Sequence, residues 1–200
     1  ELCIATGYFN AAGWLMVADE VEKVGKVRLL LGAEPSPSHE MTPRSPGDPV
    51  EPQRTHQAIE RIHAQQIKNL TEERNKEFGF HQNGLGRLQK LLEFFKSDQV
   101  EVRRCESRFF HAKAWLFRNE AHGVLAGSSN LTAAGLMHNL ELNLGHTHPD
   151  VLNEVEAWYD EVWEDSEPFD LAQLYEELFQ EFSPWSIYLR ELWELYGEEL

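Results

Sequence analysis

The stretch "LCIATGYFNAAGWLMVADEVEKVGKVRLLLG", from Leu2 to Gly32, decides the fold class. Leu2–Phe9 is an apolar run that ends in a Gly-aromatic turn, a pattern typical of a buried strand. An amphipathic helix closed by Gly25 is predicted next, and Lys26–Gly32 is a second buried strand. Because strand, helix and strand in this order favour parallel pairing, we expect an α/β fold in which helices pack against a sheet.

The later chain continues with the same kinds of element. Val100–Cys105 alternates as a strand, whereas Ala33–Gln53 holds six prolines and no periodicity, so we expect a flexible, exposed insertion there. A polar helix is predicted over 55–76. Further helices are predicted from four apolar stripes, which are Leu88, Leu91, Leu92 and Phe95; Val151, Val155, Trp158 and Val162; Leu171, Leu174, Tyr175, Leu178, Phe179 and Phe182; and Trp185, Tyr188, Leu189, Leu192 and Tyr196.

The net charge of the 200 residues is −16, which argues against a general nucleic-acid binder. The acid is concentrated, however. Residues 164–200 hold eleven Asp or Glu and one Arg, whereas residues 54–118 hold thirteen Lys or Arg and eight Asp or Glu, so a local basic surface remains possible. We find no apolar run of membrane-spanning length and no signal-peptide pattern, and we expect Cys3 and Cys105 to be buried, reduced thiols. These features predict a cytoplasmic protein without a membrane partner.

A second stretch, from Phe109 to Asn143, combines residues for which an ordinary core has little use. In the predicted strand His111–Arg118, His111 and Lys113 are two residues apart, so their side chains share a face. A bare pair of this kind is most often only the polar end of a strand. A hairpin turn then leads into a second buried strand that ends at Gly127.

The residues after this hairpin are suited to binding an anion. Gly127 allows a backbone to approach a ligand, and the side chains of Ser128, Ser129 and Asn130 offer hydrogen-bond donors. Backbone N–H groups at the start of a helix predicted next would point to the same place. A helix cap with a tight turn is the simpler alternative. Glu141 is the one charge in a predicted strand over Asn139–Gly145, and His111 is its expected partner.

Taken together, these motifs resemble the phospholipase D superfamily, whose signature is H-x-K, then an acid, then G-S-x-N, then a Glu on the next strand. The resemblance takes in "GYFN" at Gly7–Asn10 and spans residues 1–165. It implies a catalytic domain in which a mixed β-sheet is sandwiched between helices in three α/β/α layers, with extra C-terminal helices. Residues 166–200 would be an acidic helical extension that leads to a missing downstream region.

The version of the motifs resembles the nuclease-type domain found at the front of some bacterial helicases of defence or repair systems. Ser183–Leu200 resembles the linker helix before such a motor. Two departures from the family pattern stand out. Arg118 occupies the position of the usual Asp, and the gap before G-S-x-N is two residues longer than usual, so that Glu120 could take the place of the acid. Because that acid is structural in the family, its loss concerns strand packing more than chemistry.

The resemblance assigns a role to each site residue. His111 attacks phosphorus and forms a phosphohistidine, Glu141 orients the imidazole, and Lys113, Asn130 and Ser128 bind the non-bridging oxygens. A second His must protonate the leaving group, and the chain holds one H-x-K and one G-S-x-N. A homodimer would therefore supply it. No metal or cofactor is implied; His146 and His148 suggest a metal pair but lack a nearby third ligand.

Three functions remain open. The first is a nuclease, with DNA favoured over RNA as the substrate and a helicase region of the same protein as a possible partner. The second is a catalytically silent module that binds nucleic acid or mediates dimerisation, which Arg118 and the net charge keep open. The third, a lipid phosphodiesterase, lacks a membrane-binding helix or patch. An intact set of His111, Lys113, Asn130 and Glu141 favours activity.

Overall fold

The computed structural model describes residues 1–32, 82–107, 109–118 and 122–178. The predicted insertion at 33–53, the polar helix at 55–76 and the last predicted helix, within Ser183–Leu200, lie outside the described residues, as does Glu120.

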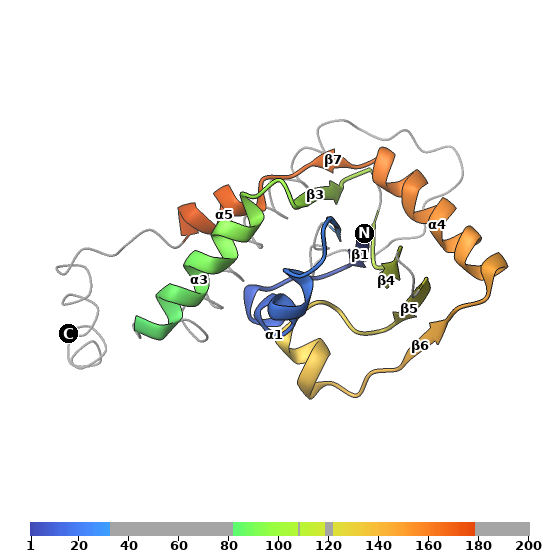
Figure 1. The fold of residues 1–200 in the computed structure, drawn as a ribbon, viewed down its shortest axis with the longest axis horizontal. Helices are drawn as coiled ribbons and strands as arrows, with labels where there is room; N and C mark the ends of the chain where they lie inside the picture. The colour runs from blue at the N-terminus through green and yellow to red at the C-terminus, as the bar shows by residue number, and fades with distance from the viewer. Residues whose placement is uncertain (33–81, 108, 119–121, 179–200) are drawn as a thin grey trace, which may run out of the picture.

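Within the described residues, seven strands form one mixed sheet in the order β6-β5-β4-β1-β2-β3-β7 (Figure 1). Strands β1, β2 and β3 are parallel, which confirms the parallel pairing predicted for the first two, and the other neighbours are antiparallel. The strands are β1 (Leu2–Thr6), β2 (Val27–Gly32), β3 (Val100–Cys105), β4 (Lys113–Phe117), β5 (Gly123–Gly127), β6 (Asn143–His146) and β7 (Glu167–Pro168). The helices are α1 (Ala11–Val21), α3 (Gln82–Phe95), the single π-helical turn η2 (Ala134–His138), α4 (Pro149–Glu164) and α5 (Leu171–Leu178).

Helices α1, α3 and α5 cover one face of the sheet. The indole of Trp14 is fully buried there, with its ring centroid 4.8 Å from that of Phe95, and Ile4 and Leu29 from the strands pack into the same core. Tyr175 of α5 belongs to this core, so described residues just beyond the predicted boundary at 165 pack with the rest of the domain. Helix α1 ends at Val21, earlier than the predicted stop at Gly25, because bonds between residues three apart tighten the chain after it.

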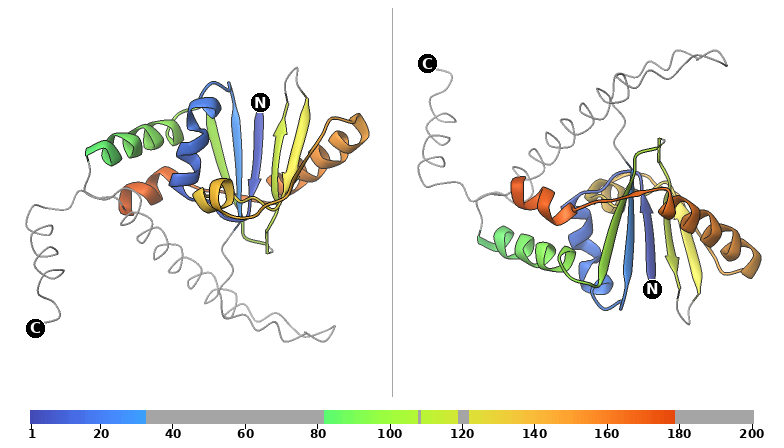
Figure 2. Two further views of the ribbon diagram at one scale, coloured as in Figure 1. Left: turned by 90° about the horizontal axis from the view of Figure 1, so that it is seen from below. Right: turned by 90° about the horizontal axis from the view of Figure 1, so that it is seen from above.

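Helix α4 covers the opposite face, so helices lie on both sides of the sheet as predicted (Figures 1 and 2). Its buried side chains differ from the predicted stripe, in which Val162 is the one fully buried member. The core instead takes Leu152, Tyr159 and Trp163, which are larger than the valines of the predicted stripe. Tyr159 also donates a hydrogen bond to the carbonyl of Arg28, 3.0 Å away, which places α4 across the central strands.

The predicted burial of the two cysteines is confirmed. Cys3 and Cys105 are fully buried and are not joined in a disulfide, and burial raises the pKa of the Cys3 thiol to about 11. None of the described helices has both the length and the apolar character needed to cross a membrane.

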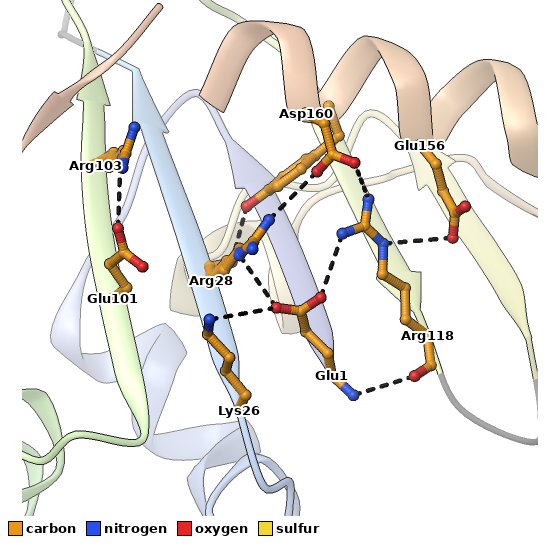
Figure 3. Close-up of polar contacts among 9 residues, drawn as sticks. Glu1, Lys26, Arg28, Glu101, Arg103, Arg118, Glu156 and Asp160 are labelled. Carbon is orange, nitrogen blue, oxygen red and sulfur yellow. Dashed lines mark hydrogen bonds and ion pairs between the residues drawn. The ribbon is translucent and has the colours of Figure 1, made fainter. Parts of the chain in front are cut away.

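Arg118, at the family's Asp position, is the centre of an ion-pair network that ties α4 to the sheet (Figure 3). Its guanidinium lies 2.8 Å from Asp160, 3.2 Å from Glu1 and 3.4 Å from Glu156. Arg28 of β2 reaches two of the same carboxylates, Glu1 at 3.1 Å and Asp160 at 3.3 Å. Arg118 follows the end of β4 that lies opposite to Lys113. The network therefore stabilises the packing of α4 without contacting the motif side chains at the other end.

Candidate active site

The motif residues meet at one edge of the sheet because of the strand directions. Thr6, the last residue of β1, is opposite Lys113, the first residue of β4, and Gly127 at the end of β5 is opposite Asn143 at the start of β6. Each of these pairs is antiparallel, so the carboxyl end of one strand lies beside the amino end of the next. The chain just outside these ends carries His111, Asn130 and Glu141.

His111 and Lys113 are in direct contact, as their spacing predicts. The Nζ atom of Lys113 lies 2.7 Å from Nδ1 of His111 and donates to the His111 carbonyl at 2.8 Å. Lys113 is 8% exposed, whereas His111 is exposed. Desolvation, followed by the charge of Lys113, lowers the pKa of His111 below its ordinary value of 6.5. The imidazole is therefore mainly neutral at pH 7.

The turn after β1 separates His111 from Asn130. The backbone N–H of Tyr8 donates to Oδ1 of Asn130 at 3.0 Å, so the carboxamide keeps its Nδ2 as the donor end. A Cβ atom added at Gly7 would lie 3.0 Å from Cδ2 of His111 and 3.3 Å from Oδ1 of Asn130. The turn itself is fixed by Thr6, whose hydroxyl donates to the Tyr8 carbonyl at 2.7 Å and accepts from the backbone N–H of Leu131 at 2.9 Å.

Gly7 and Tyr8 are thus site residues whose roles the sequence interpretation missed. Their signal was the "GYFN" turn directly after a buried strand, at the edge where sites of α/β sheets form.

Glu141 was expected to contact His111, but in the structure it contacts other residues. Strand β6 begins at Asn143, so the predicted strand over Asn139–Gly145 is wrong in its first half. Leu140 and Leu142 are 103% and 70% exposed, so no buried face holds this segment as a strand. The Glu141 carboxylate accepts from the hydroxyl of Ser128 and from Nδ2 of Asn139, and these two hydrogen bonds lower its pKa. Among the described contacts, no hydrogen bond joins Glu141 to His111.

The Gly-Ser-Ser segment is fixed by contacts with the chain that leads into β6. A side chain at Gly127 would collide with the carbonyl of Leu142 and with Asn143, so the space that was predicted for a ligand is filled by the chain that leads into β6. The Ser128 hydroxyl also accepts from the backbone N–H of Leu142 at 3.1 Å, and Ser129 Oγ accepts from Nδ2 of Asn143 at 2.7 Å. These contacts fix the loop that delivers Asn130.

The predicted set of open backbone donors at the next helix is wrong. The N–H groups of Ala133 and Gly135 donate to Asn10 Oδ1 at 3.1 Å and to Thr132 Oγ1 at 3.0 Å, and that of Leu136 donates to the Thr132 carbonyl. Asn10 Oδ1 also accepts from Gly13 N at 2.8 Å, so one side chain caps α1 and holds η2. The side chains of Lys113 and Asn130 therefore remain the main donors for a bound anion.

Two aromatic rings contact the imidazole of His111. The ring of Phe109 is stacked on it, with centroids 5.5 Å apart and planes 16° apart. The ring of Tyr8 meets it edge-on, at 5.5 Å and 82°. These rings restrict rotation of the imidazole.

The described residues contain no group of three or more His, Cys, Asp or Glu side chains that could hold a metal ion. His146 and His148, considered above as a metal pair, have local hydrogen bonds. The Nδ1 atom of His148 accepts from the backbone N–H of Asp150 at 3.3 Å and caps α4, and that of His146 accepts from the N–H of His148 at 3.2 Å.

Residues 1–163 match a protein family described as "Cardiolipin synthase, PLD-like domain". No curated protein matches the chain. Among solved structures, the phosphatidylserine synthase of Haemophilus influenzae Rd KW20 is 19% identical and has a TM-score of 0.52. That match covers 99% of this chain but 40% of the synthase, so the chain spans less than half of its length. At this identity the likeness concerns the fold.

Two further structures match over most of their own length. One is Nuc from Salmonella typhimurium, described as a phospholipase D family member, with 11% identity, 84% of this chain and 80% of that chain covered, and a TM-score of 0.45. The other is NucT from Helicobacter pylori, with 14% identity, 84% and 81% covered, and a TM-score of 0.44.

Proposed function

Because the chain belongs to the phospholipase D superfamily, we propose that it is a phosphodiesterase that cleaves nucleic acid through a phosphohistidine intermediate. The observation that carries the proposal is the contact between His111 and the buried Lys113, at the sheet edge that also presents Asn130. A neutral imidazole beside an ammonium group and an amide donor offers both a nucleophile and an anion site.

In the proposed reaction, Nε2 of His111 attacks phosphorus and forms a P–N bond while the bond from phosphorus to the leaving oxygen breaks. The ammonium of Lys113 and Nδ2 of Asn130 donate to the non-bridging oxygens, and each such donor typically contributes about 3 kcal/mol of transition-state stabilisation. Water then attacks the phosphohistidine, which releases the second product and restores the imidazole. This scheme requires no metal ion and no cofactor.

The hydrogen bond between Lys113 and His111 defines the state in which the reaction starts. An ammonium group donates to Nδ1, so the neutral imidazole carries its proton on Nε2. Attack by Nε2 requires that this proton move. A bound phosphate attracts Nζ of Lys113 away from Nδ1 of His111. The imidazole proton can then move from Nε2 to Nδ1, where it is donated to a carboxylate. Glu141 is our candidate for that carboxylate. Burial lowers the pKa of Lys113, and the charge of the nearby Glu141 opposes this effect.

The second histidine of the mechanism would come from a partner subunit. We propose a homodimer in which the partner's His111, in its protonated form, gives a proton to the leaving oxygen and takes one back from the attacking water, so that two chains share one active site. Support comes from exposed apolar side chains beside the site on the edge strand β6 and the chain before it. They are Met137, Leu140, Leu142 and Leu144, which are 67%, 103%, 70% and 69% exposed.

The biological setting belongs to the same proposal. DNA is the favoured substrate, and the similarity of Ser183–Leu200 to a linker helix supports a position in front of a helicase region. The competing function is a silent binding module, and one observation favours it. In the described structure the hydrogen-bond partner of His111 Nδ1 is Lys113 and not an acidic side chain.

A chelator experiment tests the proposed function. The protein is assayed on single-stranded and duplex DNA in the presence of EDTA, together with His111→Ala and, as a matched control, His122→Ala, which changes an exposed histidine on the β4–β5 hairpin. We expect cleavage in EDTA by the wild type and by the control, and loss of at least about 1,000-fold in His111→Ala. Cleavage that is abolished by EDTA and restored by Mg²⁺ would contradict the mechanism, and intact binding without cleavage would favour the silent module.

A further inference from the structure

Phe109 is an exposed aromatic side chain beside the proposed nucleophile, and no step of the proposed reaction involves it. It is 65% exposed and precedes His111 by two residues. A lone exposed Phe is common on protein surfaces, so exposure alone indicates nothing. Its position and orientation at the site are what require an explanation.

The geometry fixes how this ring is presented. One face of Phe109 is stacked on the imidazole of His111, with planes 16° apart, and Tyr8 meets the same imidazole edge-on. The imidazole is thereby held between two aromatic neighbours. Because Phe109 is 65% exposed even though one face is stacked on His111, its other face is open to solvent.

An open aromatic face beside a phosphate site suits a substrate with a flat group next to its phosphate. A nucleobase is such a group, and stacking of bases on aromatic side chains is how proteins hold single strands without reading their sequence. The glycerol and acyl chains of a phospholipid offer no flat ring at that position. A base in a duplex is already stacked and paired, so it reaches Phe109 only after leaving the helix.

We infer that Phe109 is the base-stacking residue of this site, and that the substrate is therefore a nucleic acid whose base beside the scissile phosphate is unpaired. The inference rests on the proposed function for the position of the phosphate, and it deepens that function by naming single-stranded nucleic acid as the substrate class. Phe109 acts on specificity and binding, and His111 retains the chemistry.

A binding experiment tests the inference without requiring catalysis. A fluorescein-labelled dT oligonucleotide of about ten residues is compared with an abasic oligomer of the same length and charge, by anisotropy. We expect the wild type to bind the dT oligomer roughly 5- to 100-fold more tightly than the abasic one. Phe109→Ala should lose this preference and Phe109→Trp should keep it. The matched control is Phe117→Ala, which removes a half-exposed phenyl from the opposite end of β4.

A kinetic experiment separates base recognition from a general disturbance of His111. Thymidine 5′-(p-nitrophenyl phosphate) and methyl p-nitrophenyl phosphate share a leaving group and differ in the base. Phe109→Ala should raise KM for the thymidine ester by about 10-fold more than KM for the methyl ester, whereas any loss of kcat through a loosened His111 should be the same for both esters. If Phe109 only positions His111, kcat and KM should change by equal factors for both esters, and that result would overturn the inference.

The remaining outcomes distinguish this inference from the function on which it rests. Cleavage of both esters with an unaltered base preference in Phe109→Ala would overturn the inference and leave the phosphodiesterase intact. A base preference that depends on Phe109, with no cleavage of any diester, would support the inference and contradict the catalytic proposal. Preferential binding of phosphatidylglycerol vesicles, or dissociation of a dimer by Phe109→Ala in light scattering, would assign the ring to a lipid or to a subunit contact and overturn it.

Discussion

The pKa of His111 depends on burial and on one close charged neighbour. Lys113 lies 2.7 Å from its Nδ1, and burial and this positive charge both lower the imidazole pKa, in that order of size. Glu141 makes no comparable contribution, because its carboxylate is bound to Ser128 and Asn139. Lys113 and Glu141 therefore affect the pKa of His111 unequally, and this difference is measurable.

We predict that Lys113→Ala raises the pKa of His111 toward 6.5, because the substitution removes the lysine charge and part of the burial. Glu141→Gln should leave the His111 pKa nearly unchanged in the substrate-free protein. An NMR titration of the imidazole in both variants and the wild type provides the measurement. A fall of the pKa in Glu141→Gln as large as the rise in Lys113→Ala, or larger, would show that the acid is the partner of His111 before substrate binds.

Gly7 limits the space between His111 and Asn130, so its replacement tests the geometry of the site. We predict that Gly7→Ala lowers kcat/KM by roughly 10- to 100-fold, since the new methyl group must displace the imidazole or the carboxamide. Gly25→Ala is the control, because nothing lies within 4 Å of the Cβ position there. Equal activity of both variants and the wild type would mean that the site tolerates a shift of this size.

Among the elements, α1 and η2 depend on a single shared side chain. Asn10 Oδ1 accepts from Gly13 N in α1 and from Ala133 N before η2. We predict that Asn10→Ala lowers the free energy of unfolding by about 1–2 kcal/mol, whereas Asn10→Asp, which keeps the acceptor, stays close to the wild type. Urea denaturation measures both. A stable Asn10→Ala variant would contradict the double role.

The elements also show where sequence patterns predict structure and where they do not. The first two strands and α1 were predictable, because each has a clear apolar period and the three elements follow one another in one short segment of the sequence. The start of β6 was misplaced because Leu140 and Leu142 alternate with polar residues as in a strand, although both leucines are exposed in the described chain. In α4 the predicted stripe overlooked Tyr159 and Trp163, whose large rings fill the core.

For the candidate site, the sequence indicated which residues lie close together better than it indicated their contacts. His111, Lys113 and Asn130 could be read from motifs, and the structure brings them to one edge of the sheet. The contact between Asn130 and Tyr8 joins residues 122 positions apart, and no local period encodes such a pair. The preference of Glu141 for Ser128 over His111 likewise depends on the path of the chain before β6.

At the scale of the whole molecule, the Arg118 network ties α4 to the sheet. We predict that Arg118→Met lowers the free energy of unfolding by roughly 1–3 kcal/mol, because three carboxylates lose a common, mostly buried partner. The control Lys23→Met breaks an exposed pair with Glu20 and should cost at most about 0.5 kcal/mol. Activity per folded molecule should persist, and its loss would place Arg118 in the site after all.

The proposed dimer makes a further prediction at this scale. Leu142→Glu with Leu144→Glu should weaken association, because the substitutions place charge on the exposed apolar edge. Light scattering should show a smaller mass, and specific activity should fall on dilution for the wild type. Met16→Glu on α1, which changes another exposed apolar side chain, is the control. A wild type that is monomeric and fully active would remove the shared site.

The central place of β1 has a consequence for the synthesis of the chain. Strand β1 pairs with β2 on one side and with β4 on the other, and the second pairing joins Leu2 to Phe117 and Thr6 to Lys113. A nascent chain therefore exposes one edge of an entirely buried, uncharged strand until more than a hundred further residues have left the ribosome. Open apolar edges of this kind promote aggregation, and pairing over such separations is slow. Expression at reduced temperature or with chaperones should accordingly raise the yield of folded protein.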